Sequence, residues 1–328
     1  MNSQWIDKVF GVQKDSFEAT AVEIFRFQYE NNPVYKDYVN ALQIDIAKLE
    51  RIEQIPFLPI QFFKTHAIKT LDFDPVILFE SSGTTGSVNS KHLVKDISLY
   101  EKSFTKGFEL FYGPVNEWCI LGLLPSYLER KNSSLVYMID KLIERSEHPQ
   151  SDFYLYEYEK LFAVLNELEK RKQKTLLIGV TFALLDFAEK FSLPLRSTII
   201  METGGMKGRR EELIRDEVHE ILKRSFKASS IHSEYGMTEL LSQAYSNGNG
   251  VFQCPPWMRI IIRDEEDPLK IKKGSGVINV IDLANIHSCS FIATDDLGKL
   301  YSDGSFEVLG RMDNSDIRGC SLLSISNP

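Results

Sequence analysis

The chain has 328 residues and a formal net charge of -8 at pH 7. Binding to nucleic acid or to an anionic membrane surface depends mainly on clustered Lys and Arg, so this acidic balance argues against both as partners. Hydrophobic residues make up 43% of the chain, as in an ordinary globular protein with a full core. The length predicts one large domain or two fused domains.

The sequence carries no recognisable signal for export or for crossing a membrane. Charged residues such as Asp7 and Lys8 interrupt any apolar core of a signal peptide. No apolar run approaches the ~18 residues that a membrane span needs. The cysteines stand far apart and show no CxxC pair: Cys119, Cys254, Cys289 and Cys320. We therefore expect reduced thiols in a cytoplasmic protein.

Strands and helices are expected to alternate through the middle of the chain. The first ~70 residues have a helical and then an irregular pattern, because prolines at 56 and 59 exclude a helix interior. Short apolar runs, which predict buried strands, then alternate with amphipathic stretches. The runs are 76–79, 119–124, 176–180 and 198–201, and the amphipathic stretches are 98–111, 161–168 and 210–224. This alternation predicts an α/β fold with a mainly parallel sheet covered by helices.

The helix expected at 210–224 has the clearest pattern. Its apolar stripe consists of Ile214, Val218, Ile221 and Leu222. Acidic residues near its start and basic residues near its end complement the helix dipole.

The sequence pattern changes after about residue 250. Strand-like runs at 277–281 and 306–309 are separated by turn residues, and Asp303 with Gly304 predicts a hairpin turn. We expect a helical and irregular segment at 1–70, an α/β nucleotide-binding core at 71–250, and a β-rich subdomain with a short tail at 251–328.

The most informative segment is a loop of small and hydroxyl residues that directly follows the apolar run at 76–79. Its residues are Ser81, Ser82, Gly83, Thr84, Thr85 and Gly86, with Lys91 shortly after. Small residues let backbone N–H groups approach phosphate oxygens, and the hydroxyls add donors. The loop is neither a Walker A loop nor a dinucleotide fingerprint, because GxxxxGK and GxGxxG are absent. By itself it is also compatible with an ordinary turn between a strand and a helix.

Two further segments accompany this loop. One is EYGMTE at 234–239, and the other is ATDDLG at 293–298, followed by GRMD at 310–313. Together with SSGTTG, in this order and at roughly this spacing, they resemble the motifs of the adenylate-forming superfamily, which includes acyl-CoA synthetases and luciferase-like enzymes. The resemblance implies an adenylate-forming α/β domain followed by a small β-rich subdomain.

A narrower resemblance covers most of the chain. The segments IPFLPIQFFKTH at 55–66, ETGGMKG at 202–208 and IRGCS at 317–321 are similar to those of the acyl-protein synthetases of the bacterial fatty acid reductase complex. The likeness implies ATP-dependent activation of a carboxylic acid of the fatty class as an acyl-adenylate, and then transfer to a cysteine of the enzyme. It also implies two partners, the acid itself and a downstream acyl-accepting or reductase protein.

The resemblance further implies a site for ATP and Mg²⁺. Lys91 and the loop at 81–86 would bind the triphosphate, Thr238 would contact the α-phosphate, and Glu239 would hold Mg²⁺. The remaining cofactor-binding positions are Gly204, Gly205, Tyr235 and Gly236 around the adenine, Asp296 at the ribose hydroxyls, and Arg311 at ribose or phosphate. Beside a phosphate loop, a carboxylate is a suitable hard oxygen ligand for Mg²⁺.

The chain departs from the superfamily pattern in two places. Four residues separate Gly86 from Lys91, where the common pattern has two. Typical members also carry a mobile C-terminal domain with a catalytic lysine after GRxD, whereas only a short tail follows Asp313 here, so we expect that domain to be missing. Cys320 would then accept the acyl group, since tethering makes the transfer intramolecular. Its other interpretation is a small buried residue.

Two alternative functions remain open on the sequence. One is an acyl- or aryl-CoA ligase that works without the usual domain. The other is a non-catalytic subunit that binds nucleotide and scaffolds a complex. The intact SSGTTG loop and the presence of Glu239 argue against decay of the site.

Overall fold

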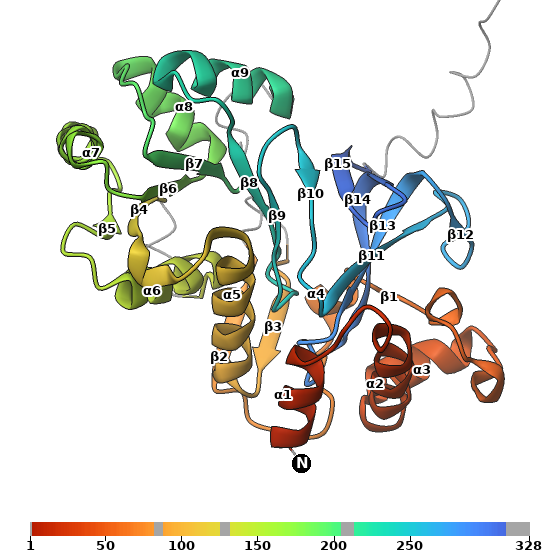
Figure 1. Ribbon diagram of the computed structural model, residues 1–328. Helices are drawn as coiled ribbons and strands as arrows, with labels where there is room; N and C mark the ends of the chain where they lie inside the picture. The colour runs from red at the N-terminus through yellow and green to blue at the C-terminus, as the bar shows by residue number, and fades with distance from the viewer. Residues whose placement is uncertain (1, 82–87, 125–131, 205–212, 313–328) are drawn as a thin grey trace, which may run out of the picture.

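The computed structural model describes residues 2–81, 88–124, 132–204 and 213–312 (Figure 1). Within these ranges no helix is long and apolar enough to cross a membrane, and the cytoplasmic location stays a prediction. The helices are α1 (Asn2–Phe10), α2 (Phe17–Asn31), α3 (Pro33–Ala41), α4 (Phe62–Thr65), α5 (Ile97–Tyr112), α6 (Ser134–Ser146), α7 (Tyr158–Arg171), α8 (Thr181–Lys190) and α9 (Arg215–Phe226), with short 3₁₀ turns at Ile46–Lys48, Ile52–Gln54 and Val115–Glu117.

A mainly parallel sheet forms one half of the molecule. Its order is β5-β4-β6-β7-β8-β9, and only β9 runs antiparallel to its neighbour. The strands are β4 (Cys119–Leu123), β5 (Asp152–Phe153), β6 (Thr175–Gly179), β7 (Thr198–Glu202), β8 (His232–Tyr235) and β9 (Ala244–Ser246). Figure 1 shows α8 and α9 above this sheet and α5 and α6 below it. The predicted runs at 119–124, 176–180 and 198–201 are therefore strands, covered by helices as expected.

The apolar run at 76–79 belongs to a different structure from the one predicted. It corresponds to β2 (Ile77–Glu80), which pairs antiparallel with β3 (Lys91–Val94) in a separate hairpin rather than joining the parallel sheet. Val76 is 69% exposed and precedes the strand. The SSGTTG loop thus connects two antiparallel strands and not a strand and a helix.

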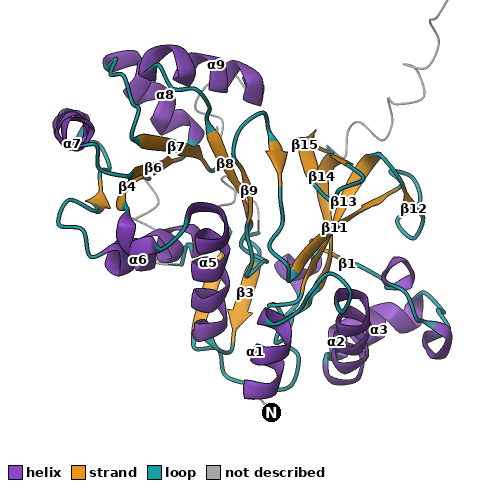
Figure 2. Ribbon diagram, in the orientation of Figure 1, coloured by secondary structure: helices purple, strands orange, loops and turns teal. Residues whose placement is uncertain are grey.

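The second half is an antiparallel sheet, which Figure 2 shows beside helices α2 and α3. Its order is β10-β15-β14-β13-β11-β12, and β1 adds to β14 in parallel. The strands are β1 (Leu58–Pro59), β10 (Val251–Phe252), β11 (Met258–Arg263), β12 (Ile271–Lys272), β13 (Ser275–Asp282), β14 (Phe291–Leu300) and β15 (Phe306–Arg311). The predicted turn between β14 and β15 is confirmed, with Gly304 at φ +90°. The strand-like runs predicted after residue 250 therefore belong to this sheet.

The N-terminal segment is attached to the antiparallel sheet by buried polar contacts. The Gln28 side chain on α2 donates to the Asn285 carbonyl at 3.0 Å and accepts from the Ser290 amide at 2.9 Å. The Ile60 amide donates to the Ala293 carbonyl at 2.9 Å, which continues the pairing of β1 with β14. Residues 1–70 thereby bring β1 and α4 to the edge of β14.

The helix predicted at 210–224 begins later than the sequence pattern suggests. Residues 205–212 lie outside the described part of the chain, and α9 starts at Arg215. Ile214 has extended backbone angles and is 65% exposed, so it does not belong to the apolar stripe. Ile221, also predicted for the stripe, is 36% exposed and does not belong to it either. The buried stripe contains Val218, Leu222 and Phe226. The helix shifts by one turn because Phe226, and not Ile214, reaches the core.

A buried aspartate joins the antiparallel sheet to the segment that follows β8. Asp282, at the end of β13, is 0% exposed. Its carboxylate accepts from the Leu241 amide at 2.7 Å, from the Ser242 amide at 3.0 Å and from the Ala284 amide at 3.1 Å. The Ser242 hydroxyl donates to it as well. Burial raises the pKa of Asp282 to about 6, and these hydrogen bonds oppose the rise.

We predict that Asp282→Asn destabilises the protein by about 1–3 kcal/mol, because an amide offers one acceptor oxygen where several donors converge. Urea unfolding at pH 7.5, where the carboxylate is ionised, measures the loss. Asp264→Asn is the matched control, since Asp264 caps a partly exposed turn between β11 and β12. Equal stability of the two variants would contradict the structural role of Asp282.

Candidate functional site

The first part of the site is a hydrogen-bonded group that links the two sheets. The Tyr235 hydroxyl, at the end of β8, donates to Asp296 Oδ2 at 2.9 Å. On the other side, Arg311 Nε donates to Asp296 Oδ1 at 3.2 Å. Asp296 and Arg311 lie opposite each other in the pairing of β14 with β15. Three residues predicted to contact adenosine are therefore adjacent, although they come from both sheets.

The second part lies between the end of β8 and the hairpin β2–β3. One ring nitrogen of His92, on β3, lies 2.8 Å from the carbonyl oxygen of Thr238, and the other lies 3.0 Å from Asn285 Oδ1. Asn285 Nδ2 donates to the carbonyl oxygen of Glu239 at 2.7 Å. Burial lowers the pKa of His92 to about 4, so the ring is neutral at pH 7. Thr238 and Glu239 are thus held in part by hydrogen bonds to their backbone carbonyl oxygens.

Glu239 is a buried carboxyl, only 4% exposed. Burial raises its pKa, because the charged form loses contact with water. A hydrogen bond with Ser90 and the positive charges of Arg311 and Lys64 oppose this rise. A carboxyl in this position favours a cation beside it.

Lys64, on α4, is a site residue that the sequence reasoning did not single out. Gln61 at the start of α4 donates to Asp295 Oδ2 at 2.7 Å, and the Phe63 ring meets the His92 ring edge-on at 6.1 Å. These two contacts place the half-buried Lys64 beside the Glu239 region. It makes no ion pair with any carboxylate in the described ranges. Lys64 lies in the IPFLPIQFFKTH segment, which resembles the acyl-protein synthetases, but that resemblance assigned no function to the lysine.

Other predicted residues are placed only in part. Ser81 closes the hairpin, since its amide donates to the Ser90 carbonyl at 3.0 Å and its hydroxyl accepts from the Ser90 amide at 2.9 Å. Lys91 is exposed at the start of β3, and strand alternation points it away from the face that carries His92. The structure does not bring Lys91 together with Glu239. Several predicted site residues lie outside the described residues: Ser82, Gly83, Thr84, Thr85, Gly86, Gly205 and Cys320.

Gly204 follows β7 in a conformation that favours glycine. Its φ is +73°, and its amide donates to Glu202 Oε1 at 2.7 Å. Thr181 also donates to this carboxylate, and Glu202 is 5% exposed. The turn after β7 is therefore fixed by a buried acceptor and presents its backbone at the same end of the sheet as Tyr235.

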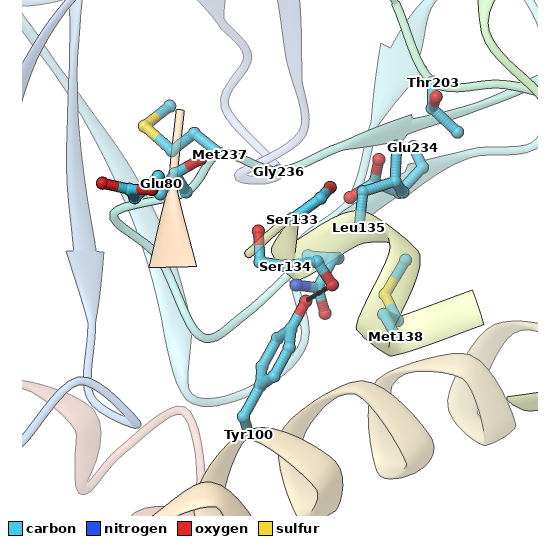
Figure 3. A pocket seen from close by; sticks show the side chains of 12 residues that line it. Glu80, Tyr100, Ser133, Ser134, Leu135, Met138, Thr203, Glu234, Gly236 and Met237 are labelled. Atoms are coloured by element: carbon cyan, nitrogen blue, oxygen red, sulfur yellow. Dashed lines mark hydrogen bonds between the residues drawn. The ribbon is translucent and has the colours of Figure 1, made fainter. Parts of the chain in front are cut away.

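A cavity of about 150 Å³ lies next to these residues (Figure 3). In the view shown, Thr203 and Glu234 lie toward one side and Glu80 and Met237 toward the other. The lining comprises Glu80, Tyr100, Ser133, Ser134, Leu135, Met138, Thr203, Glu234, Gly236, Met237, Thr238 and Gln243. Burial, together with the charge of Glu202, raises the pKa of Glu234 to about 8. The cavity is therefore continuous with Thr238 and contains a carboxyl that is mostly neutral at pH 7.

The described residues fit a metal ion that is held jointly by the protein and a nucleotide. No cluster of three or more His, Cys, Asp or Glu side chains occurs among them. Mg²⁺ is usually bound through one or two carboxylates together with substrate phosphates, so a single buried Glu239 is suitable.

The fold defines the class. The structure is similar to that of a 2-hydroxyisobutyryl-CoA ligase in complex with an acyl-AMP and CoA, with a TM-score of 0.68 and 11% identity over 92% of this chain and 70% of that one. It is also similar to ATP-bound MatB from Rhodopseudomonas palustris, with a TM-score of 0.54 and 17% identity. That alignment covers 71% of this chain, which spans about half (47%) of MatB. The fold is that of the adenylate-forming ligases.

The family follows from the sequence comparison. The family model described as acyl-protein synthetase, LuxE, matches residues 2–327, and the chain belongs to this family. It is 23% identical over 323 residues to the long-chain-fatty-acid–luciferin-component ligase of Vibrio harveyi, which covers 91% of this chain and 84% of the relative. The chain is therefore an AMP-forming acyl-protein synthetase, as the sequence motifs predicted.

We predict that Glu234→Gln changes how stability depends on pH. Because the folded pKa is about 8 and the usual value is 4.5, the folded state binds the extra proton between these values. The resulting stability is complete below about pH 4.5 and is lost as pH rises through 8. Relative to wild type, the variant should gain about 4 kcal/mol in unfolding free energy between pH 5 and 8.5.

Denaturant unfolding across this range measures the difference, with exposed Glu266→Gln as control. A wild-type-minus-variant difference that is flat with pH for both variants would contradict the assignment of a neutral Glu234.

Proposed function

We propose that this chain activates an acid of the fatty class with ATP and passes the acyl group to its own Cys320. The observation that carries the proposal is the convergence of Tyr235, Asp296 and Arg311 with the buried Glu239 at one place between the two sheets. Such a group of residues suits a nucleotide with its phosphates toward Glu239. This arrangement argues against a non-catalytic scaffold, because a buried carboxyl without a cation lowers the stability of the protein.

The adenosine part of ATP would lie near Tyr235 and Gly204. Asp296 accepts one hydrogen bond on each oxygen from Tyr235 and Arg311. A carboxylate has about four acceptor positions, so Asp296 has capacity left for the ribose hydroxyls. The Arg311 side chain is 71% exposed and lies beside Asp296, where it can also contact ribose or phosphate.

The phosphates would lie between Thr238, Glu239 and the loop at 81–86. When Mg²⁺ is bound, Glu239 would hold it, and the ion would supply positive charge to the phosphate oxygens. Lys64 and Lys91 are the candidate side chains that would supply further positive charge to the phosphate oxygens. Of these, Lys64 is favoured, because it is the one whose charge acts on Glu239. Preorganised positive charge is what stabilises the leaving pyrophosphate.

The chemistry would then run in two steps. A carboxylate oxygen of the acid attacks the α-phosphorus, and the bond to pyrophosphate breaks. The Cys320 thiol first loses its proton to solvent. The resulting thiolate attacks the acyl carbon, and the bond from that carbon to the AMP oxygen breaks. Cys320 belongs to the same chain as the site that forms the adenylate, so the second step is intramolecular.

The acid and the downstream partner are proposed from the relative. Because the Vibrio harveyi protein is named for a long-chain fatty acid, a fatty acid is the first substrate class to test. An acyl thioester on Cys320 would be an intermediate, so a reductase or another acyl-accepting protein is the expected partner.

We predict an ATP-dependent acyl adduct on the intact protein. After incubation with ATP, Mg²⁺ and a panel of acids, intact-mass spectrometry should show the wild type heavier by one acyl group. Cys320→Ser should release pyrophosphate without gaining this mass. Formation of an acyl-CoA at equal rates in wild type and Cys320→Ser would instead favour a CoA ligase.

Two further variants test the phosphate site. Glu239→Gln should lower pyrophosphate release by about 100-fold, and Lys64→Met by about 10- to 100-fold, since each removes stabilisation of charge in the transition state. Their controls are the exposed Glu266→Gln and Lys48→Met. Nucleotide binding without pyrophosphate release in the wild type would favour the scaffold function.

A further inference from the structure

Two buried polar atoms that line the cavity beside Thr238 lack hydrogen-bond partners among the described residues. The carbonyl oxygen of Gln243 and the hydroxyl of Thr203 are buried atoms without a partner in the described part of the protein. The Glu234 carboxyl lines the same cavity. Gln243 as a residue is only 5% exposed. Buried polar groups are almost always paired, so two unpaired atoms around one cavity point to a ligand.

The rest of the lining is mixed, because the polar residues Glu80, Ser133 and Ser134 stand beside apolar side chains. Leu135, Met138 and Met237 contribute hydrophobic walls, and the Tyr100 hydroxyl is already used, since it donates to the Ser134 carbonyl at 3.0 Å. A cavity of about 150 Å³ takes a molecule of roughly benzene's size, about six non-hydrogen atoms. The ligand segment is therefore short and carries at least one polar group.

The cavity also lies where an acid would have to lie. Thr238 lines it together with Glu80, the residue directly before the loop at 81–86. If Thr238 contacts the α-phosphate, the carboxylate of the acid lies at this end of the cavity. Thr203 and Glu234 are the residues that Figure 3 shows toward the other side. The enclosed segment is then the part of the acid next to its carboxylate.

We propose that the cavity binds the carbon segment next to the carboxylate of the acid and recognises a hydroxyl group on that segment through Thr203, Glu234 and Gln243. The preferred substrate is thus a hydroxylated acid and not the unsubstituted one. This inference rests on the proposed function, because it takes the cavity to be the acid site.

A hydroxyl matches the three side chains. It can donate to the Gln243 carbonyl and accept from Thr203 or from a protonated Glu234. The neutral state of Glu234 at pH 7 follows from its pKa of about 8. An ammonium group suits the cavity less well, because it can donate to Gln243 but cannot accept a hydrogen bond from Thr203.

Gly236 keeps this arrangement possible. A Cβ atom at this position would lie 2.4 Å from Glu234 Oε1 and 3.3 Å from Gln243 Cγ. Any side chain at position 236 would therefore displace the carboxyl that the hydroxyl contacts.

The test compares matched acids in ATP–pyrophosphate exchange. Hexanoate and dodecanoate are each measured beside their 2-hydroxy and 3-hydroxy forms. For one of the two positions, kcat/KM should be higher for the hydroxylated acid by at least about tenfold, because an unsubstituted acid leaves the buried polar groups unpaired. Higher kcat/KM for the unsubstituted acids, or for 3-aminohexanoate, would overturn the inference.

Variants show whether the named residues cause the preference. Thr203→Val and Gln243→Leu should lower the ratio of the two kcat/KM values toward about 1, since each removes a partner of the hydroxyl. Thr105→Val is the matched control, because Thr105 also has a buried, unpartnered hydroxyl but does not line the cavity. A ratio unchanged in Thr203→Val and Gln243→Leu would overturn the inference.

Calorimetric titration of the same acids without ATP separates the two proposals. If no acid supports exchange, the proposed function fails, while tighter binding of a hydroxylated acid by wild type than by Gln243→Leu still supports the cavity assignment. Equal binding of both acids by both proteins overturns it.

Discussion

The geometry of the site depends on the buried carboxylate of Asp282, which has no proposed role in binding the nucleotide or the acid. Asp282 ends β13 and accepts from the Leu241 and Ser242 amides, directly after Glu239. Taking a carboxylate out of water is costly, and only several well-placed donors offset the cost. Because those donors are backbone groups of the segment after β8, the position of Thr238 and Glu239 is tied to the antiparallel sheet.

The consequence is a site built from residues of two sheets. Tyr235 comes from the parallel sheet, whereas Asp296 and Arg311 come from the antiparallel one. The short α4, held by β1 against β14, adds Lys64 from a third place in the chain. In the proposed function a nucleotide would contact all three parts, and its binding energy could then hold the reacting groups in position. The buried Glu239 and the unpaired Gln243 reduce the stability of the free protein, which is common at functional sites.

Much of the fold could be predicted because buried parallel strands have a simple pattern. The runs that became β4, β6 and β7 are apolar throughout, and each lies between helices. The run at 76–79 has the same appearance, but it forms a half-buried hairpin strand, and apolar content alone does not distinguish the two. Ile214 was placed on the helix stripe for a related reason, since the period of a helix says nothing about where its first turn begins.

The site was predictable only where residues stand in a recognisable motif. Tyr235, Glu239, Asp296 and Arg311 were named from such segments, and the structure brings the four of them to one region. Lys64 and Thr203 lie in segments with a family likeness that gave them no role, and Gln243 lies in none. The roles proposed for these three residues rest on contacts between distant segments. Lys91 was also named from a recognisable segment, yet strand alternation turns it away from the face that carries His92.

The most direct measurement of the central claim follows one oxygen atom. An acid labelled with ¹⁸O in both carboxylate oxygens is incubated with enzyme, ATP and Mg²⁺, and the nucleotide and phosphate products are analysed by mass spectrometry. Acyl-adenylate formation followed by transfer predicts AMP that carries one ¹⁸O, because the acid oxygen that attacked the α-phosphorus stays with it. Label in inorganic phosphate with release of ADP, or unlabelled AMP beside an acylated product, would contradict the account.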